Sequence, residues 1–189
     1  VDAQRKPVPG TEQRFDCDTL LLSVGLIPEN ELSKAAGVEL SSATAGPLVD
    51  DALQTTVPGV FACGNVLHVH DLVDHVTLEA QRAGRAAAAF ARTGNSASRA
   101  EVRVLDGAGV RGVVPQSLCP GRLENGVTLM FRPTAVFRDA AVVVRIDGEE
   151  VFRRKHRILT PGEMADVSLP QEVFKRFAEA RELRVEVAT

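Results

Sequence analysis

The sequence predicts an α+β protein in which an incomplete α/β segment is followed by a small antiparallel β-sandwich. Two runs with continuous apolar stretches, at residues 14–24 and 59–65, are typical of short parallel strands buried on both faces. A helix-rich run with small residues along one side follows at 76–92. Beyond residue 100 the chain changes to short β-branched segments, several of which alternate apolar with polar residues, as the strands of a sandwich do.

Turn and cap signals predict further elements. A short helix is expected at 29–37, with a glycine at its C-terminal end, and a strand is expected at 46–50. Asp147-Gly148 is typical of a tight hairpin turn, and a helix is predicted at 171–183. The other strands expected in the sandwich are 127–132, 141–147, 150–154 and 165–169.

Composition and charge exclude several classes of function. Of the 189 residues, 44% are hydrophobic and 25% are charged, and the formal net charge is −3. This ordinary globular balance, without Trp or Tyr, predicts no nucleic-acid binding. The longest small apolar run, at 86–91, is too short to span a bilayer, so no membrane span is expected. Because the chain begins with Val in what reads as the middle of a domain, we expect it to be a fragment.

The three cysteines are Cys17, Cys63 and Cys119, and they lie far apart in the sequence. An odd number without a C-x-x-C pair argues against a disulfide framework or a zinc site. It suits a reducing cytoplasm, which is the expected location. Cys63 is expected to be a small buried residue, and Cys119 is a candidate exposed thiol with nothing adjacent to activate it.

Residues 107–112, GAGVRG, fit the G-x-G-x-x-G pattern of a dinucleotide-binding loop. Such a loop needs a helix starting at its third glycine, because the helix N-terminus holds the pyrophosphate. Pro115 and Pro120 follow closely and leave no room for that helix. We therefore interpret GAGVRG as a glycine-rich turn between two strands.

Two other motifs carry more information. The first is Ser23-Val24-Gly25-Leu26-Ile27-Pro28, and the second is QTTVPGVFACGN at residues 54–65. Together they resemble the pyridine nucleotide–disulfide oxidoreductase family, the flavoproteins related to thioredoxin reductase and glutathione reductase, over residues 1–93. The resemblance implies a partial FAD/NAD(P)-binding, Rossmann-like α/β segment.

The same resemblance implies cofactor-binding residues. In the family, the strand end that corresponds to Gly25 and Pro28 leads back into the FAD domain. Gly64 ends a strand at a point where no Cβ obstructs a close ligand. Asn65 stands where the family has an Asp that hydrogen-bonds the ribityl chain of FAD, and an amide can still donate and accept there.

The helix after Asn65 has a further implied role. In the family its N-terminal amides face the flavin and stabilise the negative charge of the reduced ring. This places His75, Val76 and Thr77 near the ring. His75 either donates to the flavin or makes no contact with it.

The stretch HVHDLVDH, at residues 68–75, contains three His and two Asp that suggest a metal site. A His-x-His pair in a loop can bind zinc, but the sequence shows no matching second cluster of ligands. We interpret this stretch as a partly exposed loop near the flavin and predict no metal site.

The C-terminal part resembles the tail of FAD-dependent oxidoreductases that are associated with glycerol-3-phosphate dehydrogenase or are similar to the sarcosine oxidase α-subunit. The residues that carry this resemblance are Phe131-Arg132, Lys155 and Pro161-Gly162-Glu163-Met164. It implies that the tail is a docking or interface element for a partner subunit.

These patterns divide the chain into four parts. They are the last strands of an NAD(P)-binding domain (1–16), the C-terminal half of an FAD-binding domain (17–93), a linker (94–101) and a β-sandwich-like domain (102–189).

The resemblance implies that the intact protein is an FAD-dependent oxidoreductase. It would transfer hydride between NAD(P)H and flavin and pass electrons to a small-molecule or protein acceptor. The fragment alone is expected to be inactive, and the sequence leaves its catalytic residues and its assembly as a homo-oligomer open. The alternative is a non-catalytic interaction module on a relic flavoprotein fold, which Asn65 in place of Asp favours.

Overall fold

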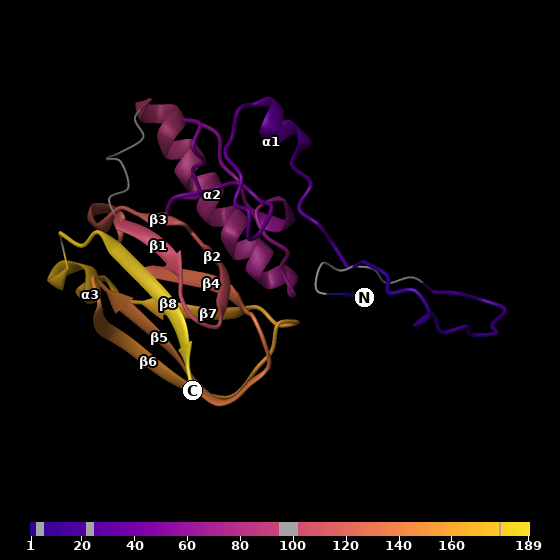
Figure 1. The fold of residues 1–189 in the computed structure, drawn as a ribbon. Helices are drawn as coiled ribbons and strands as arrows, with labels where there is room; N and C mark the ends of the chain where they lie inside the picture. Colours follow the sequence, from indigo (N-terminus) through magenta and orange to yellow (C-terminus); the bar gives the residue numbers. More distant parts are fainter. Residues whose placement is uncertain (3–5, 22–24, 95–101, 178) are drawn as a thin grey trace.

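The computed structural model describes all residues except 3–5, 22–24, 95–101 and 178. It contains a β-sandwich, a long helix beside it and an extended N-terminal arm, which we define as the described residues up to Glu29 (Figure 1). The helices are α1 (Glu31–Ala35), η1 (Gly64–Val66), α2 (Val73–Thr93), η2 (Pro120–Arg122) and α3 (Gln171–Arg176). The strands are β1 (Val102–Asp106), β2 (Val110–Val114), β3 (Ser117–Leu118), β4 (Val127–Pro133), β5 (Phe137–Ile146), β6 (Glu149–Leu159), β7 (Ala165–Leu169) and β8 (Glu182–Ala188).

Two sheets form the sandwich. The larger sheet has the strand order β3-β1-β8-β5-β6, and the smaller has the order β2-β4-β7. β1 and β8 pair in parallel, whereas β5 pairs antiparallel with β6 and β8, as β4 does with β2 and β7. The predicted β-rich module after an incomplete α/β segment is confirmed, with a parallel pairing that the sequence patterns did not predict.

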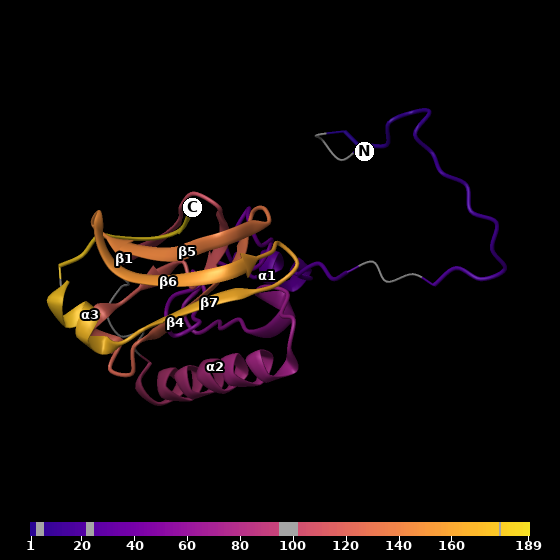
Figure 2. The ribbon, with the colours of Figure 1, turned by 90° about the horizontal axis from the view of Figure 1, so that it is seen from below.

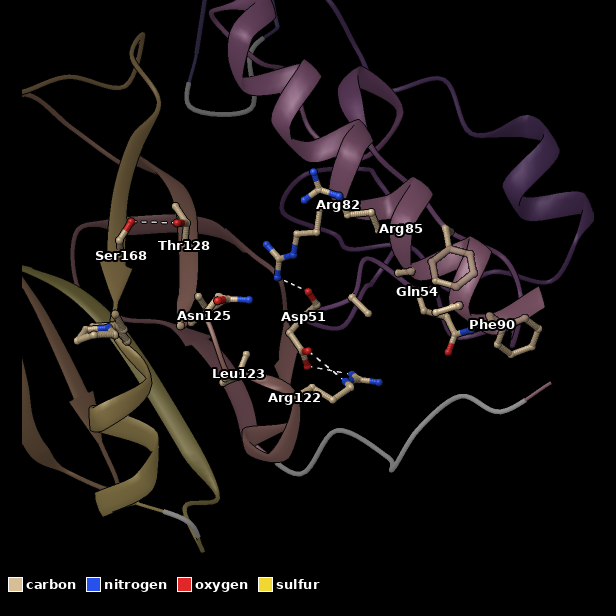
Figure 3. A pocket seen from close by; sticks show the side chains of 18 residues that line it. Asp51, Gln54, Arg82, Arg85, Phe90, Arg122, Leu123, Asn125, Thr128 and Ser168 are labelled. Carbon is tan, nitrogen blue, oxygen red and sulfur yellow. Dashed lines mark hydrogen bonds and ion pairs between the residues drawn. The ribbon is translucent and has the colours of Figure 1, made fainter. Parts of the chain in front are cut away.

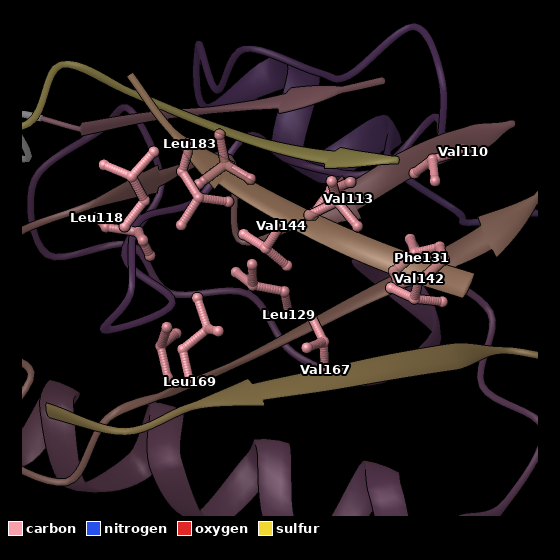
Figure 4. Packing of buried hydrophobic residues seen from close by; sticks show 14 of the residues in the cluster. Val110, Val113, Leu118, Leu129, Phe131, Val142, Val144, Val167, Leu169 and Leu183 are labelled. Atoms are coloured by element: carbon pink, nitrogen blue, oxygen red, sulfur yellow. The ribbon is translucent and has the colours of Figure 1, made fainter. Parts of the chain in front are cut away.

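The main core lies between the two sheets. In β4, Val127, Leu129 and Phe131 are buried, while the residues between them face the other side of the sheet. This period of two places one face of β4 against the larger sheet. Figure 4 shows the resulting cluster, in which the side chains of β4 meet Val113, Val142, Val144, Val167, Leu169 and Leu183.

Two tight turns have the predicted form. Asp147 and Gly148 join β5 to β6 with φ of +47° and +89°, the left-handed values that a two-residue hairpin requires. The first three residues of GAGVRG join β1 to β2, and its last three are the first residues of β2, so no helix begins at its third glycine. The carboxylate of Asp106 accepts hydrogen bonds from the amides of Gly112 and Val113 at 2.7 and 2.9 Å. The interpretation of GAGVRG as a glycine-rich turn between two strands is confirmed.

The predicted helix at 171–183 is only partly correct. α3 covers its first six residues, Gln171–Arg176, and β8 begins at Glu182. The residues of β8 alternate in burial, with Leu183, Val185 and Val187 in the core. β8 pairs with β1 on one side and β5 on the other, and this central position in the sheet overrides the local helical preference.

The strands predicted in the N-terminal half do not form. The described residues of 14–24 are extended and exposed, and 46–50 and 59–65 form only single bridges, Leu40 to Pro47, Val49 to Thr55 and Gln54 to Phe61. A strand needs a neighbour to pair its backbone groups, and the described chain supplies none to the arm. The arm therefore exposes Phe15, Leu20, Leu21, Leu26 and Ile27.

α2 forms a third layer. It lies along the outer face of the smaller sheet, on the side away from β5 and β6 (Figure 2). It begins at Val73, three residues before the predicted start, and ends at Thr93, where Gly94 follows with φ of +62°. Ala83 of α2 and Val114 of β2 belong to a small second core, which also contains Val49, Leu53, Ala62 and Leu67. No helix in the described part of the chain combines the length and the apolar character needed to cross a membrane.

The main core predicts a large effect of truncation at Phe131. Phe131 is fully buried, and Phe131→Ala should lower the free energy of unfolding by about 3–5 kcal/mol because it leaves a cavity. Chemical denaturation followed by circular dichroism measures this loss. Val136→Ala, at a side chain that is 57% exposed, is the control and should change the free energy by less than about 0.5 kcal/mol. Equal losses in the two variants would contradict this placement of the core.

Candidate functional site

Gly64 forms the turn between the second core and the helical elements. Its φ is +70°, in the left-handed region that favours glycine. A Cβ on Gly64 would lie 3.4 Å from Cγ1 of Val76, which is an ordinary contact. The backbone conformation therefore explains the glycine, and the turn lies directly against the first turns of α2.

Asn65 follows on the surface. Its Oδ1 accepts a hydrogen bond from the backbone amide of His70 at 3.1 Å, and the residue is exposed. The side chain thus closes the loop between η1 and α2. It lies at the outer side of the turn, where a ligand from solvent can also reach it.

A buried carboxylate, Glu79 of α2, holds this turn. Its Oε2 accepts a 2.5 Å hydrogen bond from the amide of Gly64 and lies 3.0 Å from Nε2 of His70. Its Oε1 lies 2.8 Å from Nε2 of His68. The three side chains are between 1% and 8% exposed, and the two imidazole centroids are 4.3 Å apart. The predicted partly exposed loop is therefore wrong at His68 and His70, which are buried.

The charge state of Glu79 follows from these contacts. Burial alone would raise the pKa of its carboxyl group, but the hydrogen bonds from His68, His70 and Gly64 outweigh burial and lower the pKa to about 2. Glu79 is therefore ionised near neutral pH. The pKa of the nearby Cys63 thiol is raised, first by burial and then by the charge of Glu79.

Two imidazole nitrogens in this region have no hydrogen-bond partner among the described residues. They are Nδ1 of His70 and Nδ1 of His75, and both are buried atoms. A buried polar atom without a partner costs about 1–3 kcal/mol, so such atoms mark places where a further group is expected. His75 lies in the first turn of α2, with its ring centroid 6.5 Å from that of His70.

The other residues predicted at the flavin take different positions. Val76 is half-buried against Gly64, and Thr77 is exposed, with its hydroxyl donating to the carbonyl of Val73. His75 lines a cavity of about 330 Å³ between α2 and the smaller sheet, together with Glu79. The structure thus brings His75 close to the Glu79 cluster, while Thr77 faces away from it.

Gly25 and Pro28 lie on the opposite side of the loop. They line a cavity of about 350 Å³ that also includes His68 and Arg132. The first two residues of that motif, 23 and 24, lie outside the described part of the chain. The cavity brings the end of the arm next to the loop that contains the buried histidines.

Asp71 connects this loop to the C-terminal module. Its carboxylate accepts hydrogen bonds from Nη2 of Arg132 at 2.6 Å and from the amide of Met164 at 2.5 Å. Burial opposes ionisation, but these bonds and the charge of Arg132 lower the pKa of Asp71. Arg132 also donates to the carbonyl of Val69 at 3.0 Å. Asp71 is therefore tied to Arg132 and Met164, two of the residues that distinguished the tail, and is no member of the Glu79 cluster.

A larger cleft of about 770 Å³ lies between α2 and the smaller sheet (Figure 3). Arg82, Arg85 and Phe90 line it from α2, and Thr128 and Ser168 line it from β4 and β7. None of the predicted cofactor-binding residues lies in it.

Asp51 at the edge of this cleft joins the two halves of the chain. Its carboxylate accepts hydrogen bonds from the amide of Cys119 at 2.6 Å and from Nε and Nη2 of Arg122 at 3.1 and 2.9 Å. Figure 3 shows the contact with Arg122. The backbone carbonyl of Asp51 accepts a hydrogen bond from Arg82. Cys119 is buried, so the prediction of an exposed thiol is wrong.

Sequence reasoning missed Glu79. The available signal was the single acidic residue of the predicted helix at 76–92, nine positions after the second His of a His-x-His pair. Only the fold shows that the loop turns back onto the helix and places Glu79 between His68 and His70.

The comparisons with known proteins identify the class of the N-terminal half. Residues 2–92 match the family model described as pyridine nucleotide-disulphide oxidoreductase. The chain is 29% identical over 178 residues to the ferredoxin reductase component of a chlorobenzene dioxygenase from Cupriavidus sp. (strain PS12), with 82% of this chain and 42% of the relative covered. It is 39% identical over 62 residues to a dihydrolipoyl dehydrogenase from Manduca sexta, with 31% and 12% covered. No solved structure matches it.

A ferredoxin–NADP reductase from Leuconostoc mesenteroides is 34% identical over 76 residues, with 39% of this chain and 23% of the relative covered. The names of these relatives are those of reductases and a dehydrogenase. Residues 2–92, just under half of the chain, are thus similar to the pyridine nucleotide-disulphide oxidoreductase family. The chain spans less than half the length of these relatives.

The connection through Asp51 can be tested by Asp51→Asn. The amide replaces a charged acceptor that is 5% exposed and presents hydrogens toward Arg122, so the free energy of unfolding should fall by about 2–3 kcal/mol. Chemical denaturation measures the change. Glu182→Gln, at an ion pair with Arg184 whose side chains are 34% and 40% exposed, should cost less than about 1 kcal/mol. If both variants lost the same small amount, Asp51 would not hold the two halves together.

Proposed function

We propose that this chain is part of an FAD-dependent oxidoreductase that takes hydride from NAD(P)H and passes electrons to a small electron-carrier protein. In this proposal residues 17–93 are the C-terminal half of the FAD-binding domain, 1–16 belong to the NAD(P)-binding domain, and 102–189 are an accessory module after a short linker. The protein works in the cytoplasm.

The observation that carries the proposal is the junction of the Gly64 turn with the start of α2. Gly64 lies near Val76 and donates its amide to Glu79, so Asn65 is held beside the first turns of a 21-residue helix. The family assignment covers all of these residues. It is this junction that we assign to the ribityl chain and the flavin ring.

The start of α2 is suited to a partly negative group. Leu72 at the N-cap has no side-chain oxygen, and no side-chain cap bonds the amides of the first turn. These amides and the helix dipole favour negative charge at this end. Bound FAD would accept the hydride, and the helix would stabilise the charge that develops on the reduced ring.

The exposed arm supports assembly with further parts of the FAD domain. Phe15, Leu20, Leu21, Leu26 and Ile27 are between 64% and 89% exposed. Such a concentration of exposed apolar side chains on an extended segment is typical of a strand that pairs with a neighbour.

The names of two relatives favour a protein as the electron acceptor. One relative is the ferredoxin reductase component of a dioxygenase, and another is a ferredoxin–NADP reductase. We infer a carrier of the ferredoxin type for this protein also, and a docking role for the C-terminal module.

Flavin binding tests the proposal in the full-length protein. The purified protein should carry a visible flavin band that bleaches on anaerobic addition of NADH or NADPH. Asn65→Asp should retain FAD, because it keeps the acceptor for the His70 amide, whereas Asn65→Leu should weaken FAD binding by about tenfold. Asn125→Leu, at an exposed asparagine that borders the larger cleft, is the matched control. A protein without a flavin band after incubation with FAD would support the relic-fold alternative instead.

The 189-residue chain alone should not oxidise NAD(P)H. The described residues contain no strand–glycine loop–helix unit of the kind that binds a pyrophosphate. Absorbance of NADH and NADPH, with added FAD and an artificial acceptor, measures turnover. Oxidation above a no-protein control would show that the chain contains a complete active site.

A further inference from the structure

We propose that His68, His70 and Glu79 form a binding site for one divalent transition-metal ion of the Zn²⁺ type. The fold brings together two imidazole nitrogens and a carboxylate oxygen, all within 4.8 Å of one another. This replaces the prediction of no metal site, which rested on the absence of a second ligand cluster in the sequence. The proposal does not depend on the flavin function.

The donor set selects the class of metal. Two imidazoles and a carboxylate are typical ligands of Zn²⁺ and of its first-row neighbours, whereas Mg²⁺ and Ca²⁺ prefer oxygen donors alone. Three protein ligands leave a coordination position for water or another group. Thiolate ligation is not needed, and Cys63 favours its neutral form beside Glu79.

The arrangement of the donors agrees with a site held in place by the fold. Both Nε2 atoms lie within hydrogen-bond distance of the Glu79 carboxylate, at 2.8 and 3.0 Å. Bound Zn²⁺ would need the three donors at metal–ligand distances of about 2.0–2.2 Å. An ion between them would replace these two hydrogen bonds, with each imidazole proton on Nδ1. The carboxylate and the two neutral rings would leave a site of formal charge +1 when occupied.

Neighbouring groups hold the ligands. The amide of Gly64 donates to Glu79, and Oδ1 of Asn65 accepts from the amide of His70. Arg132 fixes the carbonyl of Val69, between the two histidines. Contacts of this kind orient metal ligands and raise affinity.

Two cavities border the proposed metal site, and two buried imidazole nitrogens in the same region have no hydrogen-bond partner among the described residues. His68 lines the 350 Å³ cavity and Glu79 lines the 330 Å³ cavity, so the cluster lies between two hollows. The Nδ1 atoms of His70 and His75 are buried and have no partner in the described structure.

Cobalt binding to the 189-residue chain tests the site without flavin. The protein is freed of metal with a chelator and titrated with Co²⁺, whose visible absorption reports four- or five-coordinate nitrogen and oxygen ligation. We expect one Co²⁺ per chain, displaced by Zn²⁺, and a metal-dependent rise in melting temperature. Glu79→Gln and His70→Gln should each weaken binding by at least about tenfold.

His156→Gln is the matched control, since His156 lies on β6 in the larger sheet, and it should bind Co²⁺ as the unchanged chain does. Circular dichroism verifies that each variant is folded. If neither cluster variant folds, the titration of the unchanged chain decides, because equilibrium dialysis without bound Co²⁺ or Zn²⁺ overturns the proposal. Unaltered binding in folded Glu79→Gln and His70→Gln overturns it also.

Discussion

The carboxylate of Glu79 is the constraint on which the site depends. It accepts a hydrogen bond from the amide of Gly64 and lies within hydrogen-bond distance of the two buried imidazoles of His68 and His70. These contacts fix the loop between η1 and α2 to helix α2. A loop has few backbone partners of its own, so a buried ionised acceptor with three donors gives it a defined position. Removal of that charge would affect the turn, both histidines and the orientation of Asn65 at once.

The sandwich provides the platform for this arrangement. Ala83 of α2 and Val114 of the smaller sheet lie in the same small core. The 770 Å³ cleft and the 330 Å³ cavity also lie between α2 and this sheet, so the apolar contact is narrow. Polar bonds therefore carry much of the connection: Asp51 joins the second core to Cys119 and Arg122, and Asp71 joins the loop to Arg132. Such bonds have strict geometry, so they determine how the helix and its loop sit on the sheet more narrowly than apolar contact alone. The C-terminal module holds the loop through these bonds, so a change in the module would alter the position of the proposed flavin site as well as any surface that binds a partner.

Prediction from sequence succeeded where local pattern and tertiary environment agree. The alternation in 127–132 and the Asp147-Gly148 turn appear in the structure as β4 and the β5–β6 hairpin, because both depend on neighbours close in the chain. Prediction from sequence failed where tertiary contacts, and not the local pattern, determine the secondary structure. Residues 182–183 were predicted as helix and lie in a central strand, and the described part of the run predicted as a strand at 14–24 has no strand to pair with among the described residues. Glu79 was missed for the same reason, since its partners lie nine to fifteen positions away and meet it only through the fold.

The Gly64-Asn65 pair shows how one sequence signal can have two physical causes. The family resemblance assigns the glycine to close approach of a ligand and the polar residue to the ribityl chain. The structure shows that a left-handed φ already requires the glycine and that the asparagine already bonds the amide of His70. These roles are compatible, because an amide side chain has donor capacity beyond the acceptor used here. An Asp at position 65 could accept the same bond but could not donate. The Asn therefore suits a ligand acceptor next to a loop whose buried carboxylate already supplies negative charge.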